Sequence, residues 1–176
     1  MALTDKIKAI ADAIRTKTGS TDVMTLDEMP DKIAGIPSAK EPYVEETYNE
    51  DGEIIAAKFV GHTKVRDYAF ENCLDLVLAE LPAGITTIGF RAFYNCQKLV
   101  LTEIPSSITT IGNHAFNNCE SLTSIRFLGT PNSIGGYAFY DCDNLTSIKV
   151  PWSEGAVKNA PWGATNATIE YDYTGE

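Results

Sequence analysis

The chain has 176 residues, of which 44% are hydrophobic, and a formal net charge of −10. This length and composition suit one compact domain with a small additional module. The negative charge argues against binding to nucleic acid or anionic lipid, whose phosphates attract the opposite sign. The longest apolar runs are too short to cross a bilayer.

The N-terminal region has the pattern of two short helices. A leucine and three isoleucines recur at helical spacing, so residues 4–17 are predicted to form an amphipathic helix. A second helix is predicted to start at Thr25, because Thr25 and Glu28 have the spacing of a capping box, and to end by Gly35. Two such helices bury little apolar surface alone. They must therefore pack on the rest of the chain or on another copy.

A hairpin is predicted next, over residues 43–61. Two β-prone runs flank Asn49-Glu50-Asp51-Gly52, which is a turn sequence. We expect this hairpin to cover the first coil of the region that follows.

The central region repeats with a fixed period. The similar words are AFENC (69–73), AFYNC (92–96), AFNNC (115–119) and AFYDC (138–142), so each cysteine follows the previous one by 23 residues. A period of this length is typical of a solenoid, in which each coil buries its apolar face against its neighbours. The predicted core columns are Phe70, Cys73, Leu76, Phe93, Cys96, Leu99, Phe116, Cys119, Leu122, Phe139, Cys142 and Leu145.

Each coil is predicted to contain one short strand that pairs in parallel with its neighbours. TSIRF (123–127) and TSIKV (146–150) alternate as half-buried strands do. In the first two copies the inward strand position is expected at Leu78 and Leu101, one residue earlier than Ile125 in the third copy. Glycines that follow the isoleucine column are expected to supply backbone angles that a Cβ would resist. They are Gly89, Gly112 and Gly135.

The four cysteines raise the question of a metal site, a disulfide framework or a nucleophile. Zinc ligands come in short pairs such as Cys-x-x-Cys, which this chain lacks. Parallel side chains about 5 Å apart in neighbouring strands are poorly placed for disulfides. We therefore predict that the thiols pack as small apolar groups, with the preceding Asn or Asp in a turn or ladder.

The C-terminal segment is predicted to close the solenoid. Trp152 and Trp162 can cover the last Phe and Leu, and ATIEYDY (167–173) is typical of a final strand. Such caps shield the open end of a short repeat stack.

The unit ITTIGNHAFNNCESLTSI (108–125) resembles the BspA-type leucine-rich repeat, a variant found in bacterial surface proteins and in phage or prophage tail proteins. Residues 3–36 are similar to a module that opens many tail and virion-associated proteins of phages of Gram-positive bacteria. Residues 150–175 resemble the closing segment of phage proteins with these repeats. The resemblance implies a virion component at a tail or fibre.

These patterns predict an α+β chain built around a short right-handed leucine-rich-repeat solenoid of four 23-residue coils with parallel strands. The predicted parts are a helical docking or oligomerisation module (1–37), a linker with a hairpin cap (38–63), the repeats (64–152), and a C-terminal cap with a final strand (153–176).

Variable outward positions of the coils form the candidate binding surface. They include aromatic and arginine side chains, which are favoured at binding hot spots; the alternative is that they only cover the turn of each coil. The residues are Arg66, Tyr68, Phe90, Arg91, Tyr94, Asn113, His114, Tyr137 and Tyr140.

Enzyme chemistry has little support in the sequence. Asp141 and Asp143 resemble part of a calcium loop but lack its glycine and distal glutamate. His62 and His114 stand in different contexts. We expect no enzyme activity, no cofactor and no metal.

The favoured hypothesis is a phage structural protein in which residues 1–37 dock to other virion proteins or form a homo-oligomer. Its repeats would bind a host cell-surface glycan or protein. No secretory signal is apparent, because Asp5, Lys6 and Lys8 interrupt the first segment, which favours assembly in the bacterial cytoplasm and release by lysis. Two alternatives are a cell-surface adhesin of the bacterium and a head decoration or spacer protein without a receptor.

Overall fold

The structure, a computed structural model, describes residues 42–175. Within this range the chain forms eleven short strands and no helix. The two helices predicted within residues 1–37 lie outside the described residues. The described part is therefore all-β, and the predicted α+β class is not supported by it.

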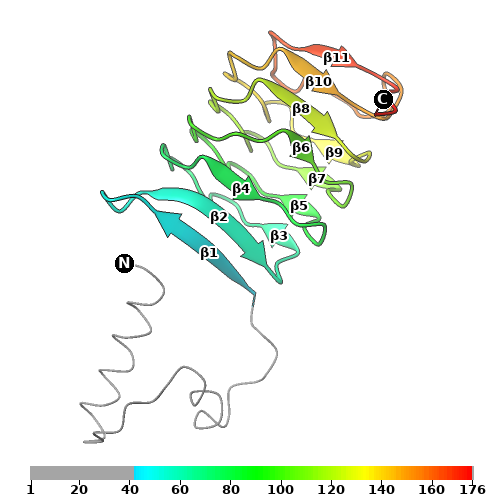
Figure 1. The fold of residues 1–176 in the computed structure, drawn as a ribbon. Helices are drawn as coiled ribbons and strands as arrows, with labels where there is room; N and C mark the ends of the chain where they lie inside the picture. Colours follow the sequence, from blue (N-terminus) through cyan, green and yellow to red (C-terminus); the bar gives the residue numbers. More distant parts are fainter. Residues whose placement is uncertain (1–41, 176) are drawn as a thin grey trace, which may run out of the picture. The chain divides into compact units, whose positions relative to one another are not determined.

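The strands follow one another along the stack in Figure 1. They are β1 (Tyr43–Tyr48), β2 (Ile54–Val60), β3 (Lys64–Val65), β4 (Leu78–Glu80), β5 (Thr87–Ile88), β6 (Glu103–Ile104), β7 (Thr110–Ile111), β8 (Ser124–Phe127), β9 (Ser133–Ile134), β10 (Ser147–Lys149) and β11 (Thr168–Glu170).

The solenoid has a principal face of parallel strands in two sections. One section has the order β1-β2-β4 and the other β6-β8-β10-β11, and an isolated bridge between Leu78 and Val100 joins them. All neighbours along this face are parallel except the β1–β2 hairpin. The chain makes about five turns, one more than the repeated cysteines predict. The extra turn has no AF-x-N-C word, and Val157, Trp162 and Ala164 are its buried residues.

A second parallel sheet was not expected from the sequence. It has the order β3-β5-β7-β9, so most coils contain two short strands instead of one. Its backbone bonds link each coil to the next, as in the bond from the Gly112 N–H to the Ile88 carbonyl (2.8 Å). The column of Val65, Ile88, Ile111 and Ile134, with exposed fractions of 3% or less, lies on these strands. Strands of two residues have too little sequence to show an alternating pattern.

The inward strand position of the first copy was predicted wrongly. Leu78 is 47% exposed, whereas Ala79 is buried at 3%. In the second copy Leu101 does pack against the core, and Thr102 and Glu103 are both exposed before Ile104 is buried again. The alternation of inward and outward side chains is thus interrupted by one additional outward residue. This interruption lies between the two sections of the principal face. A strand register is set by which side chains the core accepts, and small Ala79 fits where a leucine was expected.

The core consists of columns that run along the stack. The rings of Phe70, Phe93, Phe116 and Phe139 lie parallel, with centroids 5.6, 5.4 and 5.4 Å apart. The leucine column is fully buried, with exposed fractions of 0–1%. The predicted core is confirmed in these columns, except that Cys73 at the start of the cysteine column is only partly buried.

The thiols are hydrogen-bonded packing groups. The Sγ of Cys96, Cys119 and Cys142 each donates to the carbonyl oxygen of the phenylalanine 26 residues earlier, at 3.1, 3.1 and 3.0 Å. Burial raises the pKa of Cys96 and of Cys142 to about 12 and raises that of Cys119 strongly. The nucleophile and metal ligand is the thiolate, so these protonated thiols suit neither role. All four cysteines are free.

The repeated glycines are required for close packing. Gly89, Gly112 and Gly135 do not have positive φ angles, contrary to our expectation. A Cβ on Gly112 would lie 2.6 Å from the Phe90 nitrogen and 2.7 Å from the Gly89 carbonyl carbon. The backbones of successive coils touch at this position, and only hydrogen fits between them.

Caps close both ends of the described solenoid. The β1–β2 hairpin forms where the sequence predicts it, with its turn held by a bond from the Glu53 N–H to Asn49 Oδ1 (2.8 Å). At the other end Trp152 and Trp162 are buried and pack on Phe127, at ring distances of 5.2 and 6.2 Å. β11 then pairs with β10.

Candidate recognition surface

Two positions of the repeat have a left-handed backbone, and these shape the surface. The first holds Tyr68, Arg91 and His114, with φ of 58°, 51° and 56°; the equivalent Tyr137 of the fourth coil does not share it. The second precedes the cysteine and holds Asn72, Asn95, Asn118 and Asp141, with φ between 56° and 62°. Asn and Asp tolerate this conformation better than most residues. The turn therefore recurs with the same two left-handed residues in the first three coils, and equivalent side chains are aligned along the stack.

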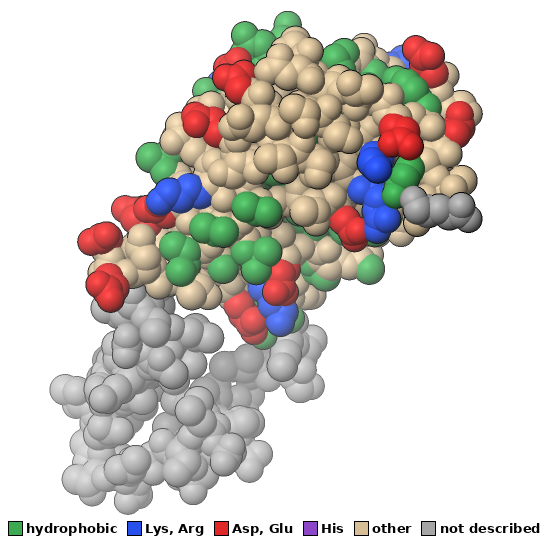
Figure 2. Space-filling model, turned by 45° about the horizontal axis from the view of Figure 1, so that its top comes forward, with side chains coloured by type: hydrophobic (Ala, Val, Ile, Leu, Met, Phe, Trp, Pro, Cys, Tyr) green, Lys and Arg blue, Asp and Glu red, His purple; other side chains and the backbone are tan. Residues whose placement is uncertain are grey.

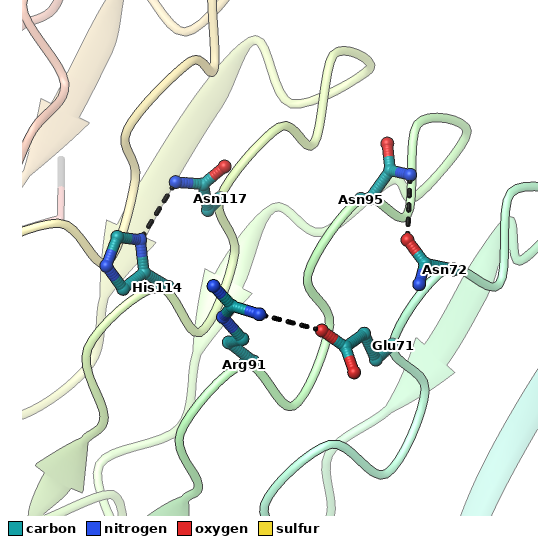
Figure 3. A network of polar contacts seen from close by, with 6 residues as sticks. All are labelled: Glu71, Asn72, Arg91, Asn95, His114 and Asn117. Atoms are coloured by element: carbon teal, nitrogen blue, oxygen red, sulfur yellow. Dashed lines mark hydrogen bonds and ion pairs between the residues drawn. The ribbon is translucent and has the colours of Figure 1, made fainter.

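The asparagines also bond to one another. Asn95 Nδ2 donates to Asn72 Oδ1 at 2.9 Å, and Asn118 Nδ2 donates to Asn95 Oδ1 at 2.7 Å. The first of these bonds is drawn in Figure 3. The predicted ladder is confirmed for these three residues, and it fixes the spacing of the turns beside the cysteine column.

Five of the candidate binding residues form a continuous row of rings, which we call the aromatic ladder: Tyr68, Phe90, His114, Tyr137 and Tyr140. Successive ring centroids are 5.3, 6.0, 5.2 and 5.7 Å apart. His114 and Tyr137 stack at 8°, and the other pairs are close to perpendicular. Since the residues come from four coils, the ladder follows the axis of the stack.

The ladder is open to solvent at three tyrosines. Tyr68, Tyr137 and Tyr140 are 52%, 55% and 42% exposed, and Phe90 and His114 are half-buried. None of the three tyrosine hydroxyls has a hydrogen-bond partner among the described residues, and neither has that of half-buried Tyr94. The rings are thus held by contact with one another, and the hydroxyls are free to bond elsewhere.

Arg91 is held beside the ladder and its charge is compensated. Its guanidinium lies 5.4 Å from the Phe90 ring centroid and 4.7 Å from that of Tyr94. Arg91 Nη1 is 3.2 Å from Glu71 Oε1, and His114 Nδ1 is 3.0 Å from Asn117 Nδ2 (Figure 3). A paired, ring-stacked arginine adds planar surface without a free positive charge.

Two of the nine candidate residues have other positions or roles. Asn113 Oδ1 accepts a bond from the Gly136 N–H (3.1 Å), as Asp67 Oδ1 does from the Phe90 N–H (2.8 Å), so this side chain holds the turn. Arg66 lines a separate cavity of about 300 Å³ beside Phe59 and Phe70. The structure thus brings together seven of the nine residues.

The cavity also contains His62, which the sequence did not connect to any site. The cavity is lined by Val44, Glu46, Phe59, His62, Lys64, Arg66, Asp67, Ala69 and Phe70. The ring of His62 contacts Phe59 edge to face, and its Nε2 has no hydrogen-bond partner within residues 42–175. The lining residues come from the hairpin and the first coil, which follow each other in the sequence but share no motif that would group them.

A second exposed feature, the sheet-face patch, consists of Leu74, Val77, Leu78 and Val100. Their exposed fractions lie between 44% and 48%. Figure 2 shows a group of hydrophobic side chains on a face that is otherwise largely backbone and polar side chains. In later coils the position of Leu78 is taken by Ser124 and Ser147. This patch was not expected from the sequence, because Leu78 was predicted to point inward.

Residues 42–175 contain no cluster of three or more His, Cys, Asp or Glu side chains that could hold a metal ion. In the same range no helix is long and apolar enough to traverse a membrane.

A profile of the BspA type Leucine rich repeat region matches residues 62–161 in six copies. The chain belongs to the BspA-type leucine-rich repeat family. The matched residues include all four AF-x-N-C words and end within the predicted C-terminal cap.

Two solved structures share the repeat fold. A leucine-rich repeat protein from Bacteroides ovatus is 27% identical, with a TM-score of 0.55 over 63% of this chain and 28% of that chain. A leucine rich cell surface protein from Faecalibacterium prausnitzii is 23% identical, with a TM-score of 0.50 over 64% of this chain and 39% of that one. The present chain therefore spans less than half of either protein. No curated protein sequence matches it.

Proposed function

We propose that this BspA-type repeat chain is a non-enzymatic virion protein of a phage, associated with a tail or fibre, and that its repeats bind a receptor on the host cell. The aromatic ladder is the observation that carries the proposal. Exposed aromatic side chains that lie next to a stacked arginine are typical of binding hot spots. Its three tyrosine rings are 42–55% exposed, so they are available to a partner.

The location in a virion rests on the resemblance of residues 3–36 and 150–175 to phage proteins. In this proposal residues 1–37 dock to other virion proteins or form a homo-oligomer. Several copies would then be presented together, and linked weak sites bind with high effective concentration. The protein would be assembled in the bacterial cytoplasm and released by lysis.

A cell-surface adhesin of the bacterium is the main alternative. One structural neighbour is described as a cell surface protein. At 23% identity that likeness shows the fold alone. The other alternative is a head decoration or spacer protein, which would need no receptor and leaves the exposed ladder without a role.

Immunogold electron microscopy of a lysate from the strain that carries the gene tests the location. The antibody is raised against residues 42–175, and particles from a strain with the gene deleted are the control. Gold at tail tips or fibres supports the proposal. Gold on heads favours the decoration alternative, and labelled cell envelopes beside bare particles favour the adhesin and contradict the virion proposal.

A further inference from the structure

We propose that the aromatic ladder binds a neutral carbohydrate chain laid along the axis of the solenoid. This inference rests on the proposed receptor-binding function and specifies the class of receptor. Three properties of the ladder carry it: its linear form, its unbonded hydroxyls and its lack of uncompensated positive charge.

The linear form favours a polymer over a small molecule. The five rings extend over four coils, with steps of 5.2 to 6.0 Å between centroids. The cavity beside Phe59 and His62 is lined by none of the ladder residues, although Asp67 and Ala69, the chain neighbours of Tyr68, do line it. A shallow row of rings cannot enclose a compact ligand, but it can contact successive units of an extended one. The C–H faces of sugar rings pack well on aromatic side chains, whose π surfaces are weakly negative.

The hydroxyl groups supply the polar half of such a contact. Tyr68, Tyr94, Tyr137 and Tyr140 each have a phenolic hydroxyl without a partner among the described residues. Each can donate one hydrogen bond and accept another. A carbohydrate offers both donors and acceptors around each ring, so it can satisfy these hydroxyls while its apolar face covers the aromatic carbons.

The charge distribution selects a neutral chain. The guanidinium of Arg91 is compensated by Glu71 at 3.2 Å, and Asp141, next to Tyr140 in sequence, is exposed. The whole chain carries a net charge of −10. An acidic polysaccharide or a phosphate-containing polymer would be repelled by this field. A neutral chain would be unaffected by it.

A protein receptor fits the ladder less well. Protein interfaces have a broad, closely packed apolar centre, whereas the ladder is a narrow row with exposed ends. The sheet-face patch, with Leu74, Val77, Leu78 and Val100, has more of the character of a protein contact. It therefore provides a matched control for the experiment.

The test measures binding of the labelled full chain to cells of the strain that carries the gene. One portion of the cells is treated with periodate, which oxidises sugar diols, and another with a protease. The variants are Tyr137→Ala with Tyr140→Ala, Tyr137→Phe with Tyr140→Phe, and the control Leu78→Ser with Val100→Ser. All these side chains are exposed, so melting temperatures should stay at the wild-type value.

We expect periodate to abolish binding and protease to leave it intact. The double alanine variant should bind at least tenfold more weakly, the phenylalanine variant should lose part of the affinity, and the patch control should bind as the wild type does. The purified neutral polysaccharide of the same cells, used as the direct probe in affinity electrophoresis, should retard the wild type and not the alanine variant.

Other outcomes overturn the inference in distinguishable ways. If protease abolishes binding and periodate does not, the ligand is not a carbohydrate. The proposed receptor-binding function would still stand in that case. Loss in the patch control alone would contradict the ladder as the site. An absence of binding to untreated cells would overturn the carbohydrate inference and the proposed receptor function together.

Discussion

The contact between successive coils at the repeated glycines leads to a sharp prediction, because two neighbouring glycines should respond oppositely to the same change. In Gly135→Ala the new Cβ would lie 2.5 Å from the Asn113 nitrogen and 2.6 Å from its Cα. The first distance falls 0.9 Å short of the 3.4 Å at which ordinary van der Waals contact begins. In Gly136→Ala the new Cβ would meet nothing within 4 Å.

The magnitudes follow from these contacts. Relief of the clash at residue 135 requires the two coils to separate, and overpacking of this kind costs about 1–3 kcal/mol. The same movement strains the bond from the Gly135 N–H to the Ile111 carbonyl (2.9 Å), for a further loss of about 1 kcal/mol. We therefore expect Gly135→Ala to lower the free energy of unfolding by about 2–4 kcal/mol. Gly136→Ala should leave it unchanged or raise it by up to about 1 kcal/mol, through the less flexible unfolded chain.

Urea denaturation of the full chain measures both variants, with far-UV circular dichroism for the strands and tryptophan fluorescence for the C-terminal cap. The two tryptophans are buried at 5% and 0% exposure, so their emission should shift when the cap opens. Equal stabilities for the two variants would refute the packing explanation of the glycines. A loss of stability in Gly136→Ala alone would show that the close contact between coils lies at residue 136 and not at residue 135.

Three further predictions concern the columns. Phe116→Ala removes a fully buried ring stacked between Phe93 and Phe139, so it should cost about 3–5 kcal/mol in urea denaturation; a loss equal to that of half-exposed Phe90→Ala would contradict the column. Asn118→Ala should destabilise the fold by about 2 kcal/mol, through its left-handed backbone and its ladder bond, and Asn118→Gly should recover the backbone part; identical losses would show that the backbone angle is unimportant. Because burial raises the pKa of Cys96 and Cys142 to about 12 from 9.0, the unfolded chain loses protons between these values while the native chain keeps them. The contribution of these two thiols to stability should therefore be constant below about pH 9 and fall above it. Cys96→Ala with Cys142→Ala should make the loss of stability at alkaline pH less steep, although Cys119, whose pKa is also raised, still contributes; a slope unaffected by the variant would refute the burial explanation.

The period of the sequence was sufficient to predict the columns. Identical residues at a fixed spacing must occupy equivalent places in a stacked fold, so the inward positions of Phe116, Cys119 and Leu122 could be predicted without knowledge of the backbone path. The turn that displays the candidate residues follows from the same argument, since an Asn or Asp in every copy indicates a strained or bonded position.

Features that depend on distances between coils could not be predicted from the period of the sequence. The glycine column was attributed to backbone angles, but its cause is the approach of the preceding coil, which no single repeat contains. The alternation of buried and exposed residues is interrupted at Thr102 and Glu103, which are both exposed. This could not be predicted from one segment, because strand register depends on how two segments pair. The aromatic ladder likewise combines residues from three different positions of the repeat: Phe90 from one, Tyr68, His114 and Tyr137 from the next, and Tyr140 from a third. Their contacts depend on the direction of each side chain.

The uniform offset between bonded residues has a consequence for how such a chain can change over generations. The asparagine ladder joins residues 23 apart, and the thiol bonds join residues 26 apart in every coil that has them. Duplication or deletion of 23 codons within the repeats would insert or remove a whole coil and leave the asparagine and thiol bonds of the remaining coils with equivalent partners. The length of the exposed surface can thus be altered by recombination between repeats of the gene itself, with both caps retained. An insertion into the columns that is not a multiple of 23 residues would shift them out of register.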